Sequence, residues 1–213
     1  PYAFPATAHG GGYDDVTFKD GAAYISASNP KTDAKGAVVG GPAVIEATLG
    51  ADHKVAVLPA LDGKAVAADV VTGAKGALNL TDPDSMVAAP GGELMLDSQD
   101  DSELVFFRPA KGAPAGVKVL HLLGGAKVDD TVFVTAPRGH VLIADTKGGT
   151  VYRLDAPAWS VGSAFSAVGP IKAGAKAPAY AAYVGAIDLH SGAAIPVASG
   201  FANPHGMAFV ADK

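Results

Sequence analysis

The chain has 213 residues and a formal net charge of −5, with 27 Gly, 15 Pro and no Cys. Apolar residues make up 49% and charged residues 17%, which excludes a disordered chain, and the frequent Gly and Pro exclude long helices. The absence of Cys excludes disulfides and thiolate zinc sites, and without a Lys/Arg cluster we expect no nucleic acid partner. The composition is typical of a turn-rich β-protein, and the length suits a single domain over residues 1–213.

The first predicted repeat unit covers residues 12–61. Its strands are expected at 16–18, 23–28, 43–49 and 54–61, where apolar residues alternate with small or polar ones. The pair Asp20-Gly21 between the first two strands is a typical tight turn.

The second and third units, 81–123 and 128–168, share one pattern. The stretch from Asp84 to Asp97 and the stretch from Asp130 to Asp145 each read as a strand, a Pro/Gly turn and a second strand, and the first acid recurs after 46 residues. Strands expected at 163–168, 183–189 and 194–199 indicate a fourth unit, placed at about 169–213, and residues 201–210 resemble the first strand of another unit. The segments 62–83 and 169–180 are longer than this period allows and are expected to carry insertions.

A period of about 40–50 residues with several strands per unit is typical of the blades of a β-propeller. We therefore predict an all-β fold, a β-propeller of four-stranded antiparallel blades. Because a ring must close to bury its blade faces, we expect about four blades that form part of a larger, six-bladed ring. A β-sandwich in which the repeat is a coincidence is the alternative architecture.

Acidic residues recur at the start of the predicted first strands. In a propeller these starts gather around the central channel, where converging carboxylates repel one another unless a cation neutralises them. A hard divalent ion with oxygen ligands, Ca²⁺ above all, suits such a site. The alternative interpretation is that each aspartate caps a turn by accepting backbone N–H groups, and for Asp97 and Asp145 the turn interpretation is favoured. The candidate metal ligands are Asp14, Asp15, Asp84, Asp129, Asp130 and Asn203.

The stretches YDDVTFKDGAAYISASNP, PDSMVAAPGGELML, VDDTVFVTAPRGHVLIAD and NPHGMAF together resemble the calcium-dependent propeller superfamily of gluconolactonases (SMP-30-like proteins), paraoxonases and strictosidine synthase-like proteins. The resemblance is nearest to uncharacterised secreted bacterial members. It implies an extracellular or periplasmic protein whose signal peptide has been removed, and a small-molecule ligand or substrate in the channel.

The resemblance also implies roles for single residues. Asp14 corresponds to a ligand of a catalytic calcium, and Asp15 and Asp84 to ligands of a structural one. Asp129-Asp130 is similar to an Asp-Asn pair of the family, and the segment 201–206 to a ligand stretch. Asparagines of the family are replaced here by Pro83, by Asp130 and by either Asn203 or His205, so the catalytic site departs from the family more than the fold does.

His205 stands at the channel register beside the predicted metal, where it is a candidate general base or ligand, or simply a hydrogen-bonded histidine at a strand start. Two functions follow. The first is a secreted calcium-binding propeller with lactonase- or esterase-like hydrolase activity, with His205 and Asp130 as catalytic residues. The second is a non-catalytic propeller that acts as a scaffold for a ligand or protein, with a structural metal or none. The sequence indicates no membrane span and no particular oligomeric state.

Overall fold

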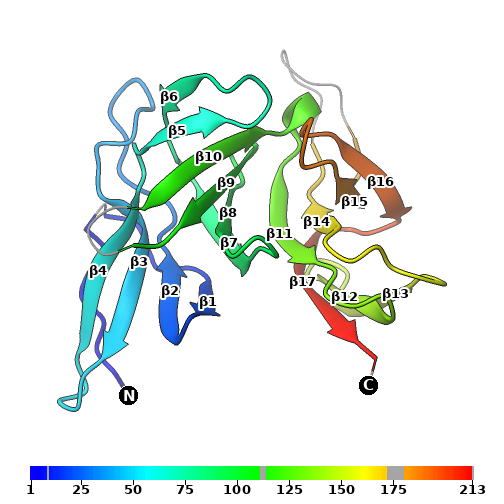
Figure 1. Ribbon diagram of the computed structural model, residues 1–213, viewed down its shortest axis with the longest axis horizontal. Helices are drawn as coiled ribbons and strands as arrows, with labels where there is room; N and C mark the ends of the chain where they lie inside the picture. Colours follow the sequence, from blue (N-terminus) through cyan, green and yellow to red (C-terminus); the bar gives the residue numbers. More distant parts are fainter. Residues whose placement is uncertain (9, 111–113, 172–179, 213) are drawn as a thin grey trace. The chain divides into compact units, whose positions relative to one another are not determined.

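The computed structural model describes residues 1–8, 10–110, 114–171 and 180–212, and these residues form an all-β fold (Figure 1). The strands form four small sheets, which confirms four blades, but only two of them have the predicted four strands and the others have six and three. The predicted insertion at 169–180 falls mostly outside the described residues. Within them the only helix is the short 3₁₀ turn Leu123–Gly125, and none is long and apolar enough to cross a membrane.

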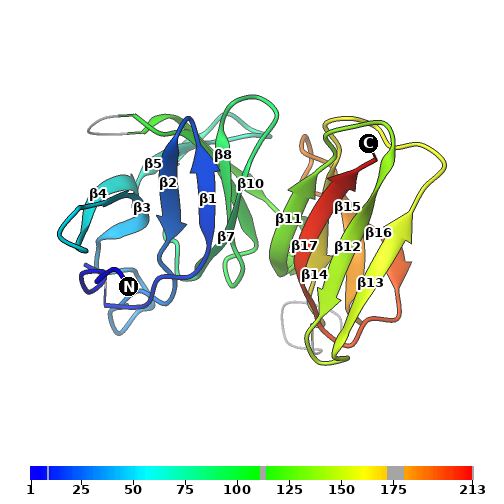
Figure 2. The same ribbon diagram turned by 90° about the horizontal axis from the view of Figure 1, so that it is seen from below.

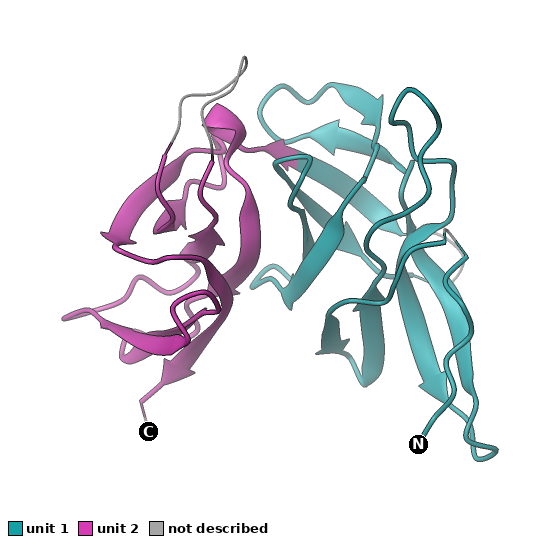
Figure 3. Ribbon diagram, turned by 180° about the vertical axis from the view of Figure 1, so that it is seen from behind, with its two compact units in different colours: residues 1–119 teal, residues 120–213 magenta. Residues whose placement is uncertain are grey.

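The chain divides into two compact units, Pro1–Val119 and Leu120–Lys213, shown in different colours in Figure 3. Each unit contains two of the four sheets. The β-strands in chain order are β1 (Val16–Lys19), β2 (Ala22–Ser26), β3 (Pro42–Leu49), β4 (Val55–Asp62), β5 (Val66–Asp69), β6 (Lys75–Ala77), β7 (Pro83–Ala88), β8 (Leu94–Ser98), β9 (Glu103–Arg108), β10 (Ala115–His121), β11 (Val128–Phe133), β12 (Gly139–Asp145), β13 (Thr150–Asp155), β14 (Ala164–Val168), β15 (Tyr183–Ile187), β16 (Ala194–Ser199) and β17 (Pro204–Ala211).

In the first unit, β1 to β4 pair in chain order as an antiparallel sheet, and β7 to β10 follow one another in the second sheet. The segment 62–83, predicted to be an insertion, contributes β5 and β6 to the edge of that second sheet, where β5 runs parallel to β10. The core of the unit is apolar, with Leu61, Leu94 and Phe107 fully buried. In β8 and β9 consecutive residues are buried, so these two strands bury both of their faces.

The second unit pairs its strands out of chain order. The sequence pattern reads β11 and β12 as successive strands of one hairpin, but β11 pairs with β14 in the sheet β11-β14-β15-β16. β12 instead lies between β13 and β17 in a three-stranded antiparallel sheet, visible in Figure 2. Because both edges of β12 are occupied by these two strands, no edge remains for β11. A strand pattern predicts that a strand exists, but not which neighbour it takes.

Trp159 anchors the core of the second unit. Its ring is 8% exposed and makes edge-to-face contacts with Phe165 and Phe209, with centroids 5.3 and 5.8 Å away. Its indole N–H donates to the carbonyl oxygen of Gly139 over 2.8 Å. Gly139 has φ +151, and a Cβ there would collide with the backbone of Val210, so this close approach of β12 and β17 requires glycine. The only tryptophan of the chain thus covers the end of the core of the second unit.

β-bulges occur where the sequence places its candidate site residues. The register shifts between Val128 and Thr131 in β11, between Pro83 and Met86 in β7, and between Pro204 and Met207 in β17, and at each shift two residues oppose one on the neighbouring strand. A bulge leaves an extra residue out of the ladder and turns its side chain and backbone groups in a new direction. The bulged residues are Asp129 and Asp130, Asp84 and Ser85, and His205 and Gly206.

Candidate functional site

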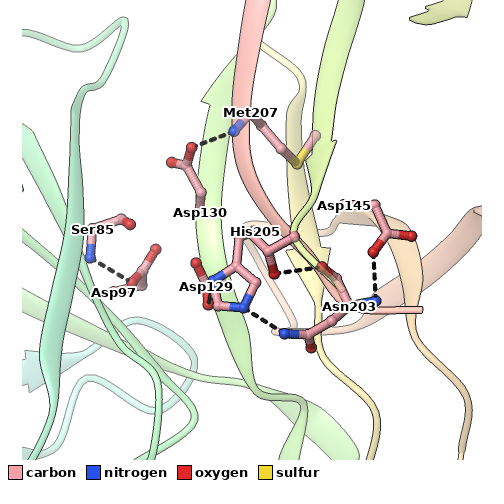
Figure 4. A network of polar contacts seen from close by, with 9 residues as sticks. Ser85, Asp97, Asp129, Asp130, Asp145, Asn203, His205 and Met207 are labelled. Carbon is pink, nitrogen blue, oxygen red and sulfur yellow. Dashed lines mark hydrogen bonds and ion pairs between the residues drawn. The ribbon is translucent and has the colours of Figure 1, made fainter. Parts of the chain in front are cut away.

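In the second unit a hydrogen bond next to the bulges of β11 and β17 connects the sheet of β11 with the sheet of β17. The Oδ2 atom of Asp130 accepts a hydrogen bond from the backbone N–H of Met207 over 2.5 Å. Asp130 lies in the β11 sheet and Met207 in the β17 sheet, so this carboxylate joins the two sheets of the unit (Figure 4). A charged acceptor makes a stronger hydrogen bond than a neutral one. Asp130, a predicted catalytic residue and metal ligand, therefore has a structural contact.

His205 contacts the neighbouring acid instead. Its Nδ1 atom lies 2.7 Å from Oδ2 of Asp129, with side chains that are 39% and 13% exposed. Its Nε2 atom lies 2.5 Å from Nδ2 of Asn203 (Figure 4). Since Asp129 accepts the Nδ1 proton, Nε2 of the neutral ring carries the lone pair and accepts from the Asn203 amide. A carboxylate that holds Nδ1–H fixes the tautomer and orientation of a histidine, as in base–orienter pairs.

Asp145, at the end of β12, is a second organising carboxylate of this unit. It is 2% exposed, and its two oxygens accept the backbone N–H groups of Ala202 (2.7 Å) and Asn203 (2.9 Å). It also accepts from Gly148 N–H in the turn that follows β12. The N–H of Ala202, and less strongly those of Gly148, Asn203 and Lys147, lower the pKa of Asp145, although burial acts in the opposite direction. Asp145 thereby fixes the backbone that carries Asn203, two residues before His205.

The first unit repeats the carboxylate contact between its two sheets. Oδ2 of Asp15, just before β1, accepts the backbone N–H of Met86 in β7 over 2.8 Å. Asp15 and Asp130 are each the second acid of an Asp-Asp pair, and Met86 and Met207 each stand three residues after a proline that begins a bulged strand. The two units therefore contain the same contact.

The other predicted residues of the first unit lie near this contact. The backbone N–H of Asp14 donates to the carbonyl of Ser26, and the Asp14 side chain is exposed. Asp84 lies half-buried in the bulge of β7. Asp97 is fully buried in β8, and its Oδ1 accepts the backbone N–H of Ser85 over 3.1 Å (Figure 4). Asp97 and Asp145, for which the sequence favours turn residues, are both buried, and Asp145 does accept a backbone N–H of the turn that follows β12.

The predicted calcium requires about six to eight oxygen ligands. In the described part of the chain no group of three or more His, Asp or Glu side chains is arranged to hold a metal ion. The acids that do lie at the predicted register have other contacts, since Asp15 and Asp130 hold backbone N–H groups and Asp129 holds His205. These residues do not form a calcium cage, so no chemical step is assigned to a metal, and calcium binding stays a prediction.

The Asp129–His205 pair is not predicted from the sequence, which gives Asp129 as a metal ligand and His205 as a candidate general base or ligand without joining the two. The sequence does contain a signal for this pair. Pro-x-x-Met occurs at 83–86 and again at 204–207, each time after one of the Asp-Asp pairs at 14–15 and 129–130. In the second unit the two motifs lie on β11 and β17, and in the first unit they lie just before β1 and on β7. This recurrence would have placed Asp129 and His205 on neighbouring bulges.

Comparisons with known proteins return no match: none among protein-family models, none among curated proteins and none among solved structures. The β-propeller blades are thus established by the sheets themselves. The relation to gluconolactonases and paraoxonases stays a prediction.

The lowered pKa of Asp145 predicts a pH-dependent stability. A carboxyl whose pKa is lower when folded stabilises the protein above its ordinary value of 3.8 and loses that contribution as the pH falls below it. We expect Asp145→Asn to lower the melting temperature at neutral pH, and the difference from wild type to narrow below about pH 4. Thermal unfolding followed by circular dichroism across this range measures both effects.

The matched control is Asp155→Asn. The pKa of Asp155 is also lowered, first by its hydrogen bond to Arg153, but this pair is exposed and contributes little to stability. A melting-temperature difference for Asp145→Asn that is the same at every pH would contradict the assigned role.

Metal removal tests the calcium prediction against the structural role of the acids. Because Asp15 and Asp130 already hold backbone donors, we expect EDTA to leave the melting temperature of the protein unchanged. A decrease of several degrees that added Ca²⁺ reverses, and Mg²⁺ does not, would instead establish a calcium site.

Proposed function

We propose that the chain is a hydrolase of small ester or lactone substrates, with His205 as the general base and Asp129 as the carboxylate that orients it. The observation that carries this proposal is the 2.7 Å contact between Nδ1 of His205 and Oδ2 of Asp129. Both residues belong to bulged strand segments of the second unit, a type of position that is common beside active sites.

The protonation states support a base at Nε2. Asp129 is only 13% exposed, so its charge acts on the imidazole with less screening than a surface carboxylate would. It favours the tautomer with the proton on Nδ1 and stabilises the imidazolium that forms when Nε2 takes a proton. His205 is 39% exposed, so water and a substrate can reach the ring.

In the proposed reaction, a water molecule replaces the Asn203 amide as the partner of Nε2. His205 takes one proton from the water as its oxygen bonds to the substrate carbonyl carbon. The tetrahedral intermediate then breaks its bond to the alkoxide leaving group, which receives the proton from the imidazolium. The products are a carboxylic acid and an alcohol, joined in one molecule for a lactone. The Asn203 amide, released from Nε2, can donate to the oxyanion.

The backbone around this centre is held by the other two acids. Asp130 fixes Met207, two residues after His205, and Asp145 fixes Asn203 from the opposite side. We therefore assign Asp130, given as catalytic from the sequence, a positioning role. Rigid support of this kind limits movement of the base, which matters because displacements of about 1 Å reduce catalysis strongly.

A second candidate function is a non-catalytic scaffold for a ligand or protein. The use of Asp15, Asp130 and Asp145 as acceptors for backbone N–H groups favours it, because each acid then has a sufficient structural reason to be present. The two functions differ in one respect only: the scaffold needs no basic nitrogen at His205.

Turnover of aryl esters and simple lactones tests the proposal. We expect His205→Gln to lower kcat by about 10²-fold to 10⁴-fold, the usual contribution of a general base, with little change in melting temperature. Asp129→Asn is expected to lower kcat as well, because the neutral amide no longer holds the Nδ1–H tautomer with a charged acceptor.

His190→Gln is the matched control. His190 also lies beside an acid, with Nδ1 3.5 Å from Asp188 Oδ1, but its side chain is 97% exposed in a turn. This variant should keep wild-type turnover. Equal turnover by His205→Gln and wild type, or no turnover by wild type on either substrate class, would refute the hydrolase and leave the scaffold.

A further inference from the structure

The outer edge strands of the four sheets differ in how they are protected. An exposed edge offers unpaired N–H and C=O groups to other strands, and natural proteins block it with proline, bulges or very short strands. β4 carries Pro59 and pairs with β3 through two register shifts, and β16 carries Pro196 beside a register shift. β6 has only three residues. Three of the four outer edges are therefore blocked.

β13 has none of these protections. Its six residues, Thr150–Asp155, contain no proline, and all six pair with β12 in a continuous register. No other strand of the described residues pairs with its outer edge. Five of the six residues are exposed, and Val151 is 68% exposed. A regular, accessible edge of this length can accept another strand.

The sheet of β13 has three strands, whereas the sheet that contains β7, β8 and β9 in the first unit has six. In the first unit β7, β8 and β9 are followed by β10, which covers the outer edge of β9. In the second unit β17, β12 and β13 pair in the same antiparallel manner, but after β13 the chain continues into the other sheet. The place that β10 fills in the first unit is unfilled among the described strands of the second.

The two faces of β13 differ in character. Leu154 packs against the core around Trp159, and the ring of Tyr152 contacts Phe201 edge-to-face with centroids 5.2 Å apart. On the opposite face Arg153 and Asp155 form an exposed ion pair, with Arg153 Nη2 2.8 Å from Asp155 Oδ1. β13 therefore has Tyr152 and Leu154, an apolar row, on the face toward the core, and the charged pair Arg153 and Asp155 on the opposite face.

We propose that β13 binds β13 of a second copy of the chain in an antiparallel arrangement, so that the two three-stranded sheets become one continuous sheet. A second copy fits this edge because the charges of β13 are complementary to those of an antiparallel β13. In the two-fold register centred on Leu154, Arg153 of each copy stands opposite Asp155 of the other. The same register places the two Leu154 side chains opposite each other on the core side, next to the apolar row.

The energetics favour a reversible dimer. In the register centred on Leu154 only Arg153, Leu154 and Asp155 of each β13 lie opposite one another, a contact that is small compared with standard protein interfaces, so the dimer should dissociate on dilution. Cross-strand pairs of opposite charge stabilise a sheet and like charges opposite each other destabilise it, so the charge pattern selects the register. Addition of a strand to a free edge is an established mode of recognition, in which main-chain hydrogen bonds give affinity and side chains give specificity.

Charge exchange on β13 tests the dimer by sedimentation velocity at micromolar to high-micromolar concentrations. We expect wild type to shift from monomer to dimer over this range. Arg153→Asp places acids opposite each other and should remain monomeric throughout, as should Asp155→Arg. The double variant Arg153→Asp/Asp155→Arg restores opposite charges across the two copies and should recover the dimer.

Lys54→Asp is the matched control, because Lys54 forms an exposed ion pair with Asp52 in a turn of the first unit, with 3.6 Å between Lys54 Nζ and Asp52 Oδ2. This variant should dimerise as wild type does, and all variants should keep the wild-type circular dichroism spectrum because the substituted side chains are exposed. A wild type that stays monomeric at every concentration, a single β13 variant that dimerises like wild type, or a double variant that stays monomeric would each overturn the proposal.

Discussion

The structure of each unit depends on a carboxylate that crosses from one sheet to accept a backbone N–H of the other. Asp15 does this for Met86 and Asp130 for Met207, over 2.8 and 2.5 Å. Met86 and Met207 lie in β7 and β17, which are edge strands of their sheets, and a backbone N–H at such an edge is costly when buried without an acceptor. The second acid of each Asp-Asp pair supplies that acceptor. In the second unit the bulges next to this contact contain Asp129, the first acid of its pair, and His205.

This constraint explains why the acids stand in front of strands without requiring a metal. Carboxylates that converge at strand starts must be neutralised or hydrogen-bonded. In the described residues they are hydrogen-bonded to main-chain donors and to one histidine, with Asp145 and Asp97 buried in the neighbouring strands. The same arrangement leaves the His205 ring of the Asp129–His205 pair 39% exposed, so solvent can reach it.

The sequence predicts the local parts of this fold and fails at the non-local ones. Alternation of apolar residues predicts most strands of the first unit, and the repeat predicts the small β-sheets. It does not predict that β11 leaves its sequence neighbour for β14, since side-chain alternation reports burial and not pairing partners. Nor does it predict β5 and β6 within the segment 62–83, whose short strands are stabilised by the edge they join.

For the candidate site, the sequence predicts the residues but not their partners. The acids at the strand starts and His205 were identified as functional candidates, because their recurrence at one register is visible in the sequence. Their partners were not identified, since a backbone N–H in a distant strand has no signature among side chains. Asp97 and Asp145 resemble turn residues because each lies at or next to the end of its strand, and only the tertiary structure reveals that both are buried.

Amide hydrogen exchange at Met86 and Met207 tests the central claim most directly. Both amides should be protected from exchange in the wild type. Asp15→Ala should lower the protection of the Met86 amide, and Asp130→Ala that of the Met207 amide, each by more than about tenfold, the loss expected for a charged acceptor. Ladder amides such as that of Ile143 should keep their protection. A Met207 amide that exchanges equally slowly in wild type and in Asp130→Ala would contradict the account.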